Sequence, residues 1–336
     1  MTLSADPVLP LLELRQVSKR FGKTIDVAAR IANLIGAGMT EEVVHAVDAV
    51  SLSIAPGEVV GLVGESGCGK STLGRIAVGL YPMTSGQRFW KGEQLELLDT
   101  ASQRRKQLAI QMIFQDPTAS LNPRMRVQDI VGEAPVVHGM VRANEQQEYV
   151  QQLLARVGLD PTVLRRFPHQ FSGGQRARIG IARALAVKPE FLVCDEAVAA
   201  LDVSIQAQVL NLFMRLRDEL DLTYLFISHD LGVVRHVADR VVIMYLGRVV
   251  ESAPTDAIFA TANHPYTQAL LASAPRLEVR KIEFFAIQGE IASPLYPPSG
   301  CHFHPRCPHA MARCKVDIPV LKEVAPGHRS ACHLNG

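Results

Sequence analysis

The sequence has no long uninterrupted apolar segment. Among its 336 residues no run approaches the roughly 18 apolar residues that a membrane-spanning helix needs. Its first residues, M-T-L-S-A-D-P, carry no basic region ahead of an apolar stretch. We therefore expect neither a signal peptide nor a transmembrane helix.

Net charge is also small, because 35 Lys and Arg residues nearly balance 33 Asp and Glu residues to leave a formal charge of +2. Basic residues gather only in short runs such as Arg104-Arg105-Lys106. This balance gives no electrostatic reason to expect a nucleic-acid partner. A composition of 48% hydrophobic and 20% charged residues is typical of a globular chain, long enough for one large domain or two.

Cysteines are few and unevenly placed. Cys68 and Cys194 lie far apart in the main body. The other four crowd the last 36 residues: Cys301, Cys307, Cys314 and Cys332. This asymmetry predicts a main domain over 1–275 and a small separate Cys-rich module over 276–336. Disulfides are disfavoured, because we expect the chain to be cytosolic.

A glycine-rich loop, G-E-S-G-C-G-K-S, follows the apolar run Val59 to Val63. Its glycines let successive N–H groups turn inward around phosphate oxygens at a helix N-terminus. Lys70 supplies a positive charge for the β- and γ-phosphates, and the Ser71 hydroxyl suits Mg²⁺. The loop therefore predicts a nucleoside triphosphate site. Its residues are Gly64, Glu65, Ser66, Gly67, Cys68, Gly69, Lys70, Ser71 and Thr72.

Two carboxylates, Asp195 and Glu196, follow a second apolar run, Phe191 to Cys194. Ligands of open α/β sheets bind where strands end at their carboxyl side. We predict that Asp195 holds Mg²⁺ through its water shell and that Glu196 polarises the attacking water. The alternative, a solvated acidic pair, is uncommon directly after a buried strand.

Two further motifs point towards phosphate. Ser172 can N-cap a helix running towards Val187, and the glycines after it, Gly173 and Gly174, expose the first N–H groups of that helix. One chain rarely needs two phosphate cradles, so this one suits the nucleotide of another subunit. His229 follows a third apolar run and can hydrogen-bond a γ-phosphate, although a lone histidine is usually structural.

Strand patterns alternate with helical ones, which predicts an α/β fold with a parallel core. From about Gln128 to Leu185 the pattern is helical and more polar, so we expect an inserted helical subdomain at about 117–187. Residues 26–45 are predicted to be a surface insertion between two strands. The expected strands are Leu12 to Val17, Gly86 to Trp90, Leu108 to Phe114, Phe191 to Cys194, Leu222 to Ile227 and Val241 to Tyr245, the last turning at Gly247 into Val249-Val250.

Together these motifs, from about Leu12 to Arg276, resemble the nucleotide-binding subunit of an ABC transporter. The resemblance implies a P-loop ATPase with a parallel-sheet core, an antiparallel β subdomain and a helical signature subdomain. It also implies roles for individual residues: Phe21 stacks on adenine, Gln115 contacts Mg²⁺ and water, Ser172, Gly173, Gly174 and Gln175 face the partner's ATP, Asp202 lies in the D-loop, and His229 senses the γ-phosphate.

Longer segments, including A-S-L-N-P-R-M, D-V-S-I-Q-A-Q-V-L-N-L and H-P-Y-T-Q-A-L-L, resemble bacterial dipeptide and oligopeptide importer ATPases. Within these importers, the segments most resemble those of the ATPase subunit whose gene is usually encoded last. Three residues depart from the family pattern: Phe171 replaces Leu, Ala197 replaces Pro and Ala199 replaces Ser. The last change removes a hydroxyl that the family can use across its dimer, which affects communication between subunits rather than hydrolysis.

The resemblance implies an assembly at the cytoplasmic face of the bacterial inner membrane. Its expected partners are two permeases, a second and related ATPase, and indirectly an external substrate-binding protein. A heterodimer of ATPases is favoured over a homodimer. Peptide is the expected cargo, with nickel, glutathione, opines and sugars as alternatives. Two other classes, a soluble ABC machine and a small-molecule kinase, explain fewer of the motifs.

The four tail cysteines are separated by five, six and 17 residues. Zinc sites commonly pair ligands at Cys-x2-4-Cys, which is absent, although His302, His304, His309 and His333 are possible substitutes. Pro308 after a cysteine is closer to an iron–sulfur pattern. Spacing alone leaves an iron–sulfur cluster, Zn²⁺ and unligated thiols open. The resemblance, in which some members hold a [4Fe-4S] cluster on matching cysteines, favours a structural cluster.

Overall fold

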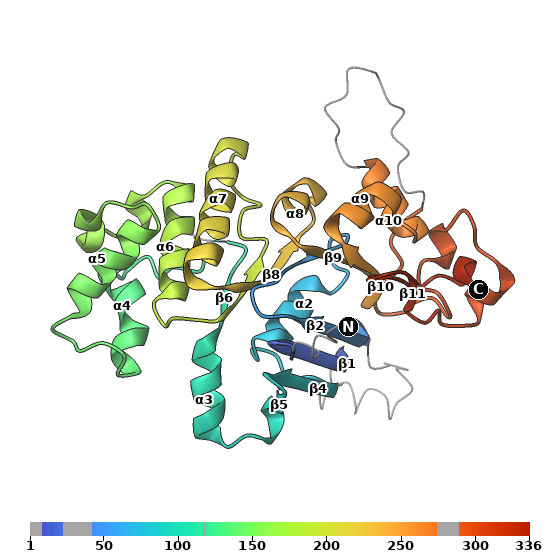
Figure 1. Cartoon of the computed structure of the whole chain (residues 1–336), viewed down its shortest axis with the longest axis horizontal. Coiled ribbons are helices and arrows are strands. Elements are labelled where there is room, and N and C mark those ends of the chain that lie inside the picture. The colour runs from blue at the N-terminus through green and yellow to red at the C-terminus, as the bar shows by residue number, and fades with distance from the viewer. Residues whose placement is uncertain (1–8, 23–41, 117–118, 274–288) are drawn as a thin grey trace, which may run out of the picture.

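The computed structural model of the protein describes residues 9–22, 42–116, 119–273 and 289–336. An eight-stranded sheet in the order β11-β12-β10-β9-β3-β8-β7-β6 crosses the middle of the molecule. A four-stranded antiparallel sheet, β2-β1-β4-β5, lies beside it (Figure 1). The predicted α/β fold, with its parallel core and its antiparallel β subdomain, is confirmed.

Five strands of the large sheet are parallel: β3 (Val59–Val63), β6 (Ile110–Ile113), β7 (Phe191–Asp195), β8 (Thr223–Ser228) and β9 (Arg240–Tyr245). They are nearly continuous apolar runs because both faces of the sheet are covered. On β8, Tyr224 and Phe226 join one core cluster while Leu225 and Ile227 join another on the opposite face. The parallel pairing places the carboxyl ends of these strands along one edge.

Helices pack closely on both faces of this sheet. They are α2 (Lys70–Ala77), α7 (Val203–Leu220) and α8 (Leu231–Val237). A Cβ on Gly61 of β3 would collide with Val234 of α8. A Cβ on Gly74 of α2 would lie 2.6 Å from Ile227 Cδ1 on the other face. Gly61 therefore permits α8 to pack closely on β3, and Gly74 permits α2 to pack closely on the sheet. β3 and α2 are the two elements that the loop connects.

The small sheet consists of β1 (Leu12–Gly22), β2 (Val43–Ile54), β4 (Ser85–Trp90) and β5 (Glu93–Gln94). It shares a core with the large sheet, for Trp90 packs edge-on against Phe191 with ring centroids 6.4 Å apart. The strand expected from Leu108 begins only at Ile110, because α3 (Thr100–Ala109), capped by the Asp99 carboxylate, continues to Ala109. The insertion expected at 26–45 lies outside the described residues, except that β2 begins at its end.

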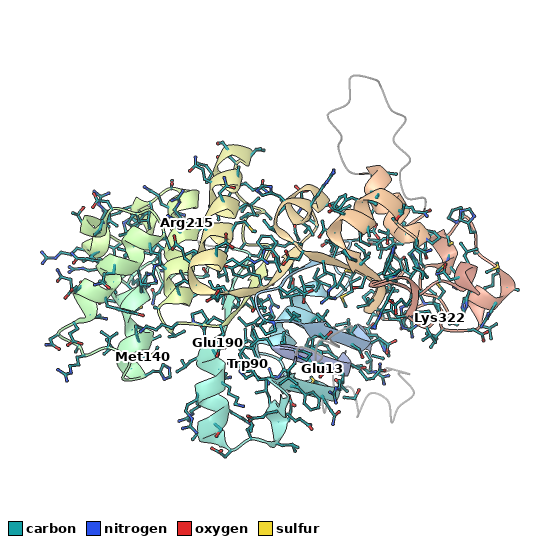
Figure 2. All side chains as sticks on the ribbon, viewed as in Figure 1. Glu13, Trp90, Met140, Glu190, Arg215 and Lys322 are labelled. Carbon is teal, nitrogen blue, oxygen red and sulfur yellow. The ribbon has the colours of Figure 1, made fainter. Side chains whose placement is uncertain are left out.

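A helical arm extends from the sheet between β6 and β7. It contains α4 (Val127–Val137), α5 (Gln146–Arg156) and α6 (Gly173–Leu185), with short 3-10 turns η2 (Pro161–Arg165) and η3 (Pro168–Gln170). Met140 in this arm and Lys322 near the C-terminus lie at opposite ends of the molecule (Figure 2). In the ranges that the structure describes, no helix is both long and apolar enough to cross a membrane.

The C-terminal residues do not form the separate module that the sequence suggested. After β10 (Arg248–Pro254), α9 (Thr255–Thr261) and α10 (Pro265–Ser273), the tail returns as β11 (Lys322–Ala325) and β12 (His328–Ser330). β12 pairs with β10, so these strands extend the main sheet. Phe303 is 1% exposed and belongs to the same core cluster as Tyr245 and Tyr266. The crowding of cysteines marked a change in composition, but strand pairing and burial join the tail to the main body.

Candidate active site

The loop between β3 and α2 follows a path that requires glycine. Gly67 and Gly69 have φ values of +78° and +103°, which disfavour residues with a Cβ. A Cβ on Gly64 would also collide with the Met244 carbonyl oxygen of β9, and one on Gly69 with the Ala46 carbonyl oxygen of β2. Gly69 caps α2 without a side chain, so the first N–H groups of that helix are suited to an anion.

Lys70, Ser71 and Asp195 lie together beneath this loop. The Lys70 ammonium is buried and donates hydrogen bonds to the carbonyl oxygens of Gly64, at 2.8 Å, and Glu65, at 2.9 Å. Ser71 Oγ donates to Asp195 Oδ1 at 2.7 Å. Burial raises the pKa of Asp195, and the hydrogen bond from Ser71 opposes that shift. A hydroxyl beside a carboxylate is a set of oxygen donors that fits Mg²⁺.

Glu196 joins side chains from the ends of three neighbouring strands. Its Oε2 accepts a hydrogen bond from Gln115 Nε2 at 2.7 Å, and its Oε1 lies 3.4 Å from His229 Nδ1. Its backbone is in the left-handed region, with φ +47°, and its N–H donates to the Ile227 carbonyl at 3.0 Å. Such backbone strain in a non-glycine residue is concentrated at functional sites. The carboxylate is thus held beside the loop that suits phosphate.

Lys70, Ser71, Gln115 and Glu196 line a pocket of about 320 Å³, whereas Asp195 and His229 are not among its lining residues. Phe21 stands at its rim, 37% exposed, with its ring edge-on to Tyr81 and the Lys19 ammonium 4.9 Å from its centroid. An exposed aromatic face suits a nucleobase. The lining residues are Phe21, Val44, Ala46, Ser66, Gly67, Gly69, Lys70, Ser71, Thr72, Gln115, Glu196 and Pro294.

The second phosphate motif lies outside this pocket. Ser172 Oγ accepts a hydrogen bond from the Gln175 N–H at 3.3 Å, and Gln175 Oε1 accepts from the Ser172 N–H at 3.0 Å, so the two form a capping box at the start of α6. Gly173 is exposed, whereas a Cβ on Gly174 would collide with Ile205 of α7. Asp202, which begins α7, is also exposed and lines no part of the pocket.

The tail cysteines, Cys301, Cys307, Cys314 and Cys332, were expected to hold a cluster or a metal ion. Within the described ranges, no group of three or more His, Cys, Asp or Glu side chains is placed to hold a metal ion. Burial, together with the smaller effect of the nearby thiols of Cys314, Cys307 and Cys332, raises the pKa of Cys301 to about 11. Spacing along the chain could not specify how far apart the sulfur atoms lie in the fold.

Sequence reasoning also missed residues of the tail that reach this site. Pro294 lines the pocket, and its carbonyl accepts a hydrogen bond from the His45 N–H at 2.9 Å. The Tyr266 hydroxyl accepts one from the Glu65 N–H at 2.9 Å. Arg306 pairs with the Glu65 carboxylate. No motif marks Pro294 or Arg306, because their partners lie more than 200 residues away in the sequence.

Comparison with known proteins identifies the class of this site. The family described as ABC transporter matches residues 47–199. A dimeric ATP-binding cassette, MJ0796, solved with ADP and Pi, superposes with a TM-score of 0.61 and 27% identity, covering 73% of this chain and 98% of that one. CbiO1 from Clostridium perfringens gives 0.61 and 25%, covering 75% and 91%. The fold is that of an ABC-type ATPase.

A second family match and two similar sequences identify the family within this class. The family described as oligopeptide/dipeptide transporter, C-terminal region, matches residues 250–314. The oligopeptide transport ATP-binding protein AppF of Bacillus subtilis (strain 168) is 50% identical over 331 residues, covering 96% of this chain and 97% of AppF. YkfD of the same organism, described as a putative oligopeptide transport ATP-binding protein, is 47% identical, covering 97% and 96%. The chain belongs to the family of oligopeptide transport ATP-binding proteins, as its motifs predicted.

The position of Glu196 generates a first prediction. Glu196→Gln replaces the predicted general base with a side chain of the same size, so hydrolysis should fall by about 10²–10⁴-fold while ATP binding is retained. Lys70→Ala should instead weaken binding itself. Single-turnover hydrolysis and equilibrium binding of MgATP separate the two effects. Hydrolysis at the normal rate by Glu196→Gln would show that another group activates the water.

Proposed function

We propose that this protein is the ATP-hydrolysing subunit that powers uptake of dipeptides and oligopeptides through a membrane ABC importer. The main support is its 50% identity to AppF across nearly the whole of both chains. The match of its tail to the C-terminal region of oligopeptide/dipeptide transporters agrees with this assignment. Its own pocket is suited to a nucleotide, so contacts to the cargo belong to other subunits.

In this proposal the P-loop binds ATP. The N–H groups at the start of α2 and the Lys70 ammonium hold the phosphates, and the exposed ring of Phe21 stacks on the base. Ser71 and Asp195, joined at 2.7 Å, would hold Mg²⁺ together with Gln115. When bound, this ion neutralises charge on the β- and γ-phosphate oxygens.

Glu196 then orients the attacking water and accepts its proton. Gln115 holds one oxygen of this carboxylate at 2.7 Å, and the other, on the His229 side, would face the attacking water. His229, 3.4 Å from Glu196, is positioned to contact both the carboxylate and a γ-phosphate oxygen. The three residues lie at the carboxyl ends of three adjacent strands. Loss of the γ-phosphate would therefore alter contacts at the ends of all three strands.

The capping box at the start of α6 serves the ATP of a second subunit. Ser172, Gly173, Gly174 and Gln175 lie outside the chain's own pocket, as a site shared between subunits requires. Two subunits would enclose two nucleotides head to tail, with Asp202 beside the shared interface. We propose a related chain as the second ATPase, and a homodimer is the alternative.

A second hollow, of about 700 Å³, lies beside Gln115 and is suited to a segment of a permease. One wall comes from the helical arm, where Ala134 belongs to α4 and Arg183 to α6. Arg183 Nη1 donates to the Ser120 carbonyl at 2.6 Å and so joins α6 to the segment after Gln115. An occupant would therefore be linked to the catalytic carboxylate through Gln115. We propose that the protein lies peripherally, on two permeases at the cytoplasmic face of the inner membrane, and indirectly in contact with a substrate-binding protein.

We also propose a main domain over 1–275, with its helical subdomain at about 117–187, and a C-terminal extension over 276–336 that carries a [4Fe-4S] cluster. Burial raises the pKa of Cys301, Cys307 and Cys332, and the nearby thiols of the set raise each value further. Four thiols within electrostatic reach of one another suit a cluster, whose ligands stand further apart than those of a single ion. Zn²⁺ is the alternative.

Reconstitution tests the proposed function. The protein, its permeases and its second ATPase are placed in liposomes with the binding protein, and labelled peptides, nickel and glutathione are supplied in parallel. We expect ATP-dependent uptake of peptide, abolished by Glu196→Gln. Uptake of another cargo alone would refute the peptide assignment. Failure to co-purify with any integral membrane protein would favour a soluble ABC machine.

The motif Ser172 to Gln175, the signature, is proposed to contact the ATP of the partner subunit, and this generates a second prediction. Gly173→Glu adds a carboxylate where the partner's γ-phosphate would bind, and a Cβ there meets only Leu201 at an ordinary 3.6 Å. Hydrolysis by the assembled complex should fall by about 10²-fold while MgATP affinity of the isolated subunit is unchanged. Ala155→Glu, on the exposed side of α5, is the matched control and should be silent. Loss of affinity in the isolated Gly173→Glu subunit would place the signature at its own site.

The cysteine proposal is tested by colour and metal content. Anaerobically purified protein should be brown and carry about four irons per chain. Cys307→Ser should bleach it, whereas His309→Ala, at an exposed neighbouring position, should not. Colourless protein with one zinc per chain would refute the cluster, and protein without metal would refute both metal assignments.

A further inference from the structure

The tail reaches the P-loop through a two-pronged ion pair. Arg306 Nη1 lies 2.7 Å from Glu65 Oε2, and Arg306 Nη2 lies 3.0 Å from Glu65 Oε1. The Arg306 side chain is 5% exposed and that of Glu65 is 20% exposed. Hydrogen bonds to Glu65 raise the pKa of Arg306. A bidentate contact of this kind fixes the orientation of the carboxylate and also places a positive charge directly against it.

The backbone that carries Arg306 is held rigidly. Arg306 ends the short turn η4 (His304–Arg306), which follows the buried Phe303. The Phe303 ring lies 5.2 Å from Tyr245 and 5.3 Å from Tyr266, measured between centroids. His302 Nδ1 lies 2.9 Å from the Leu246 carbonyl oxygen. The turn therefore cannot shift without disturbing the core beneath the P-loop.

Glu65 is held at three points, two of them by the C-terminal third of the chain. Arg306 binds its carboxylate, and the Tyr266 hydroxyl accepts from its N–H at 2.9 Å. Its carbonyl oxygen accepts from Lys70 Nζ at 2.9 Å. The same residue that the tail fixes thus supports the lysine suited to the phosphates.

A separate contact places the tail in the wall of the pocket. Pro294 lines the pocket beside Phe21 and Val44. Its carbonyl oxygen accepts a hydrogen bond from the His45 N–H of β2 at 2.9 Å. The tail therefore contacts the nucleotide site from two directions, at the phosphate loop and at the wall near Phe21.

We propose that Arg306 is a positioning residue of the nucleotide site, which makes nucleotide affinity depend on the C-terminal tail. The inference rests on the nucleotide-binding function proposed above. Without Arg306, the Glu65 carboxylate loses its counter-charge within the phosphate-binding loop, and the loop that supports Lys70 loses an anchor. Because the P-loop holds ATP in both the ground state and the transition state, the effect falls on binding rather than on the chemical step.

The test uses the full chain in its assembled complex, with MgATP as the probe. Arg306→Gln should raise the KM for MgATP by about 10-fold, the effect of losing roughly one charge-assisted hydrogen bond, and leave kcat within about 2-fold. Arg306→Lys keeps the charge but not the fork, so its KM should be intermediate. Arg329→Ala replaces an exposed arginine of the same tail, on β12, and should match the wild type.

A double variant keeps the test informative if Arg306→Gln folds poorly. Adding Glu65→Gln removes the unpaired carboxylate, so the double variant should bind MgATP more tightly than Arg306→Gln alone. An unchanged KM in Arg306→Gln would overturn the inference, as would a lower kcat at unchanged KM, which indicates a merely structural role. Lys70→Ala distinguishes failure of the proposed role of Arg306 from failure of the proposed nucleotide site. If it binds MgATP normally, the proposed nucleotide site itself is wrong.

Discussion

The site depends on the parallel pairing of the central strands. Val63 of β3 lies opposite Ser228 of β8, and Asp195 of β7 lies opposite Ile227, so these strands end at nearly the same level. The P-loop, the carboxylate pair and His229 each follow one of these ends. No short contact between them would survive a shift of register by one residue, since such a shift turns every side chain to the other face. Burial of both faces specifies the register and so places the charged groups at one edge.

The close approach of backbones imposes the second constraint. The P-loop is enclosed by the Met244 carbonyl on one side and the Ala46 carbonyl on the other, so Gly64 and Gly69 are needed for packing as well as for conformation. Both neighbours come from strands that also contact the tail, since Tyr245 of β9 packs against Phe303 and His45 of β2 binds Pro294. The nucleotide site is therefore built by three distant parts of the chain. This explains how a tail with few strong apolar runs can be ordered, because it shares a core cluster with the main domain.

The C-terminal region is part of the main domain's sheet and core, and is not the separate unit that its cysteines suggested. Its cysteines suggested a unit that needs a metal to fold, yet Phe303 and β12 attach it to the main sheet and core. The ion pair of Arg306 with Glu65 then links it to the phosphate loop. Any ligand that orders the cysteines would act on a segment already connected to the nucleotide, rather than on an independent appendage.

The sequence by itself determined the class of fold, the family and the main elements of the site. Local patterns suffice for these, because the P-loop, the Asp195-Glu196 pair and the signature each lie within a few consecutive residues beside a strand or a helix. Only the tertiary structure decided that Gln115 and His229 meet at Glu196, that the signature lies outside its own pocket, and that Pro294 and Arg306 complete the site. Those contacts join residues from 33 positions apart, for His229 and Glu196, to 249 positions apart, for Pro294 and His45. Their distances follow from strand order and burial, which no local pattern encodes.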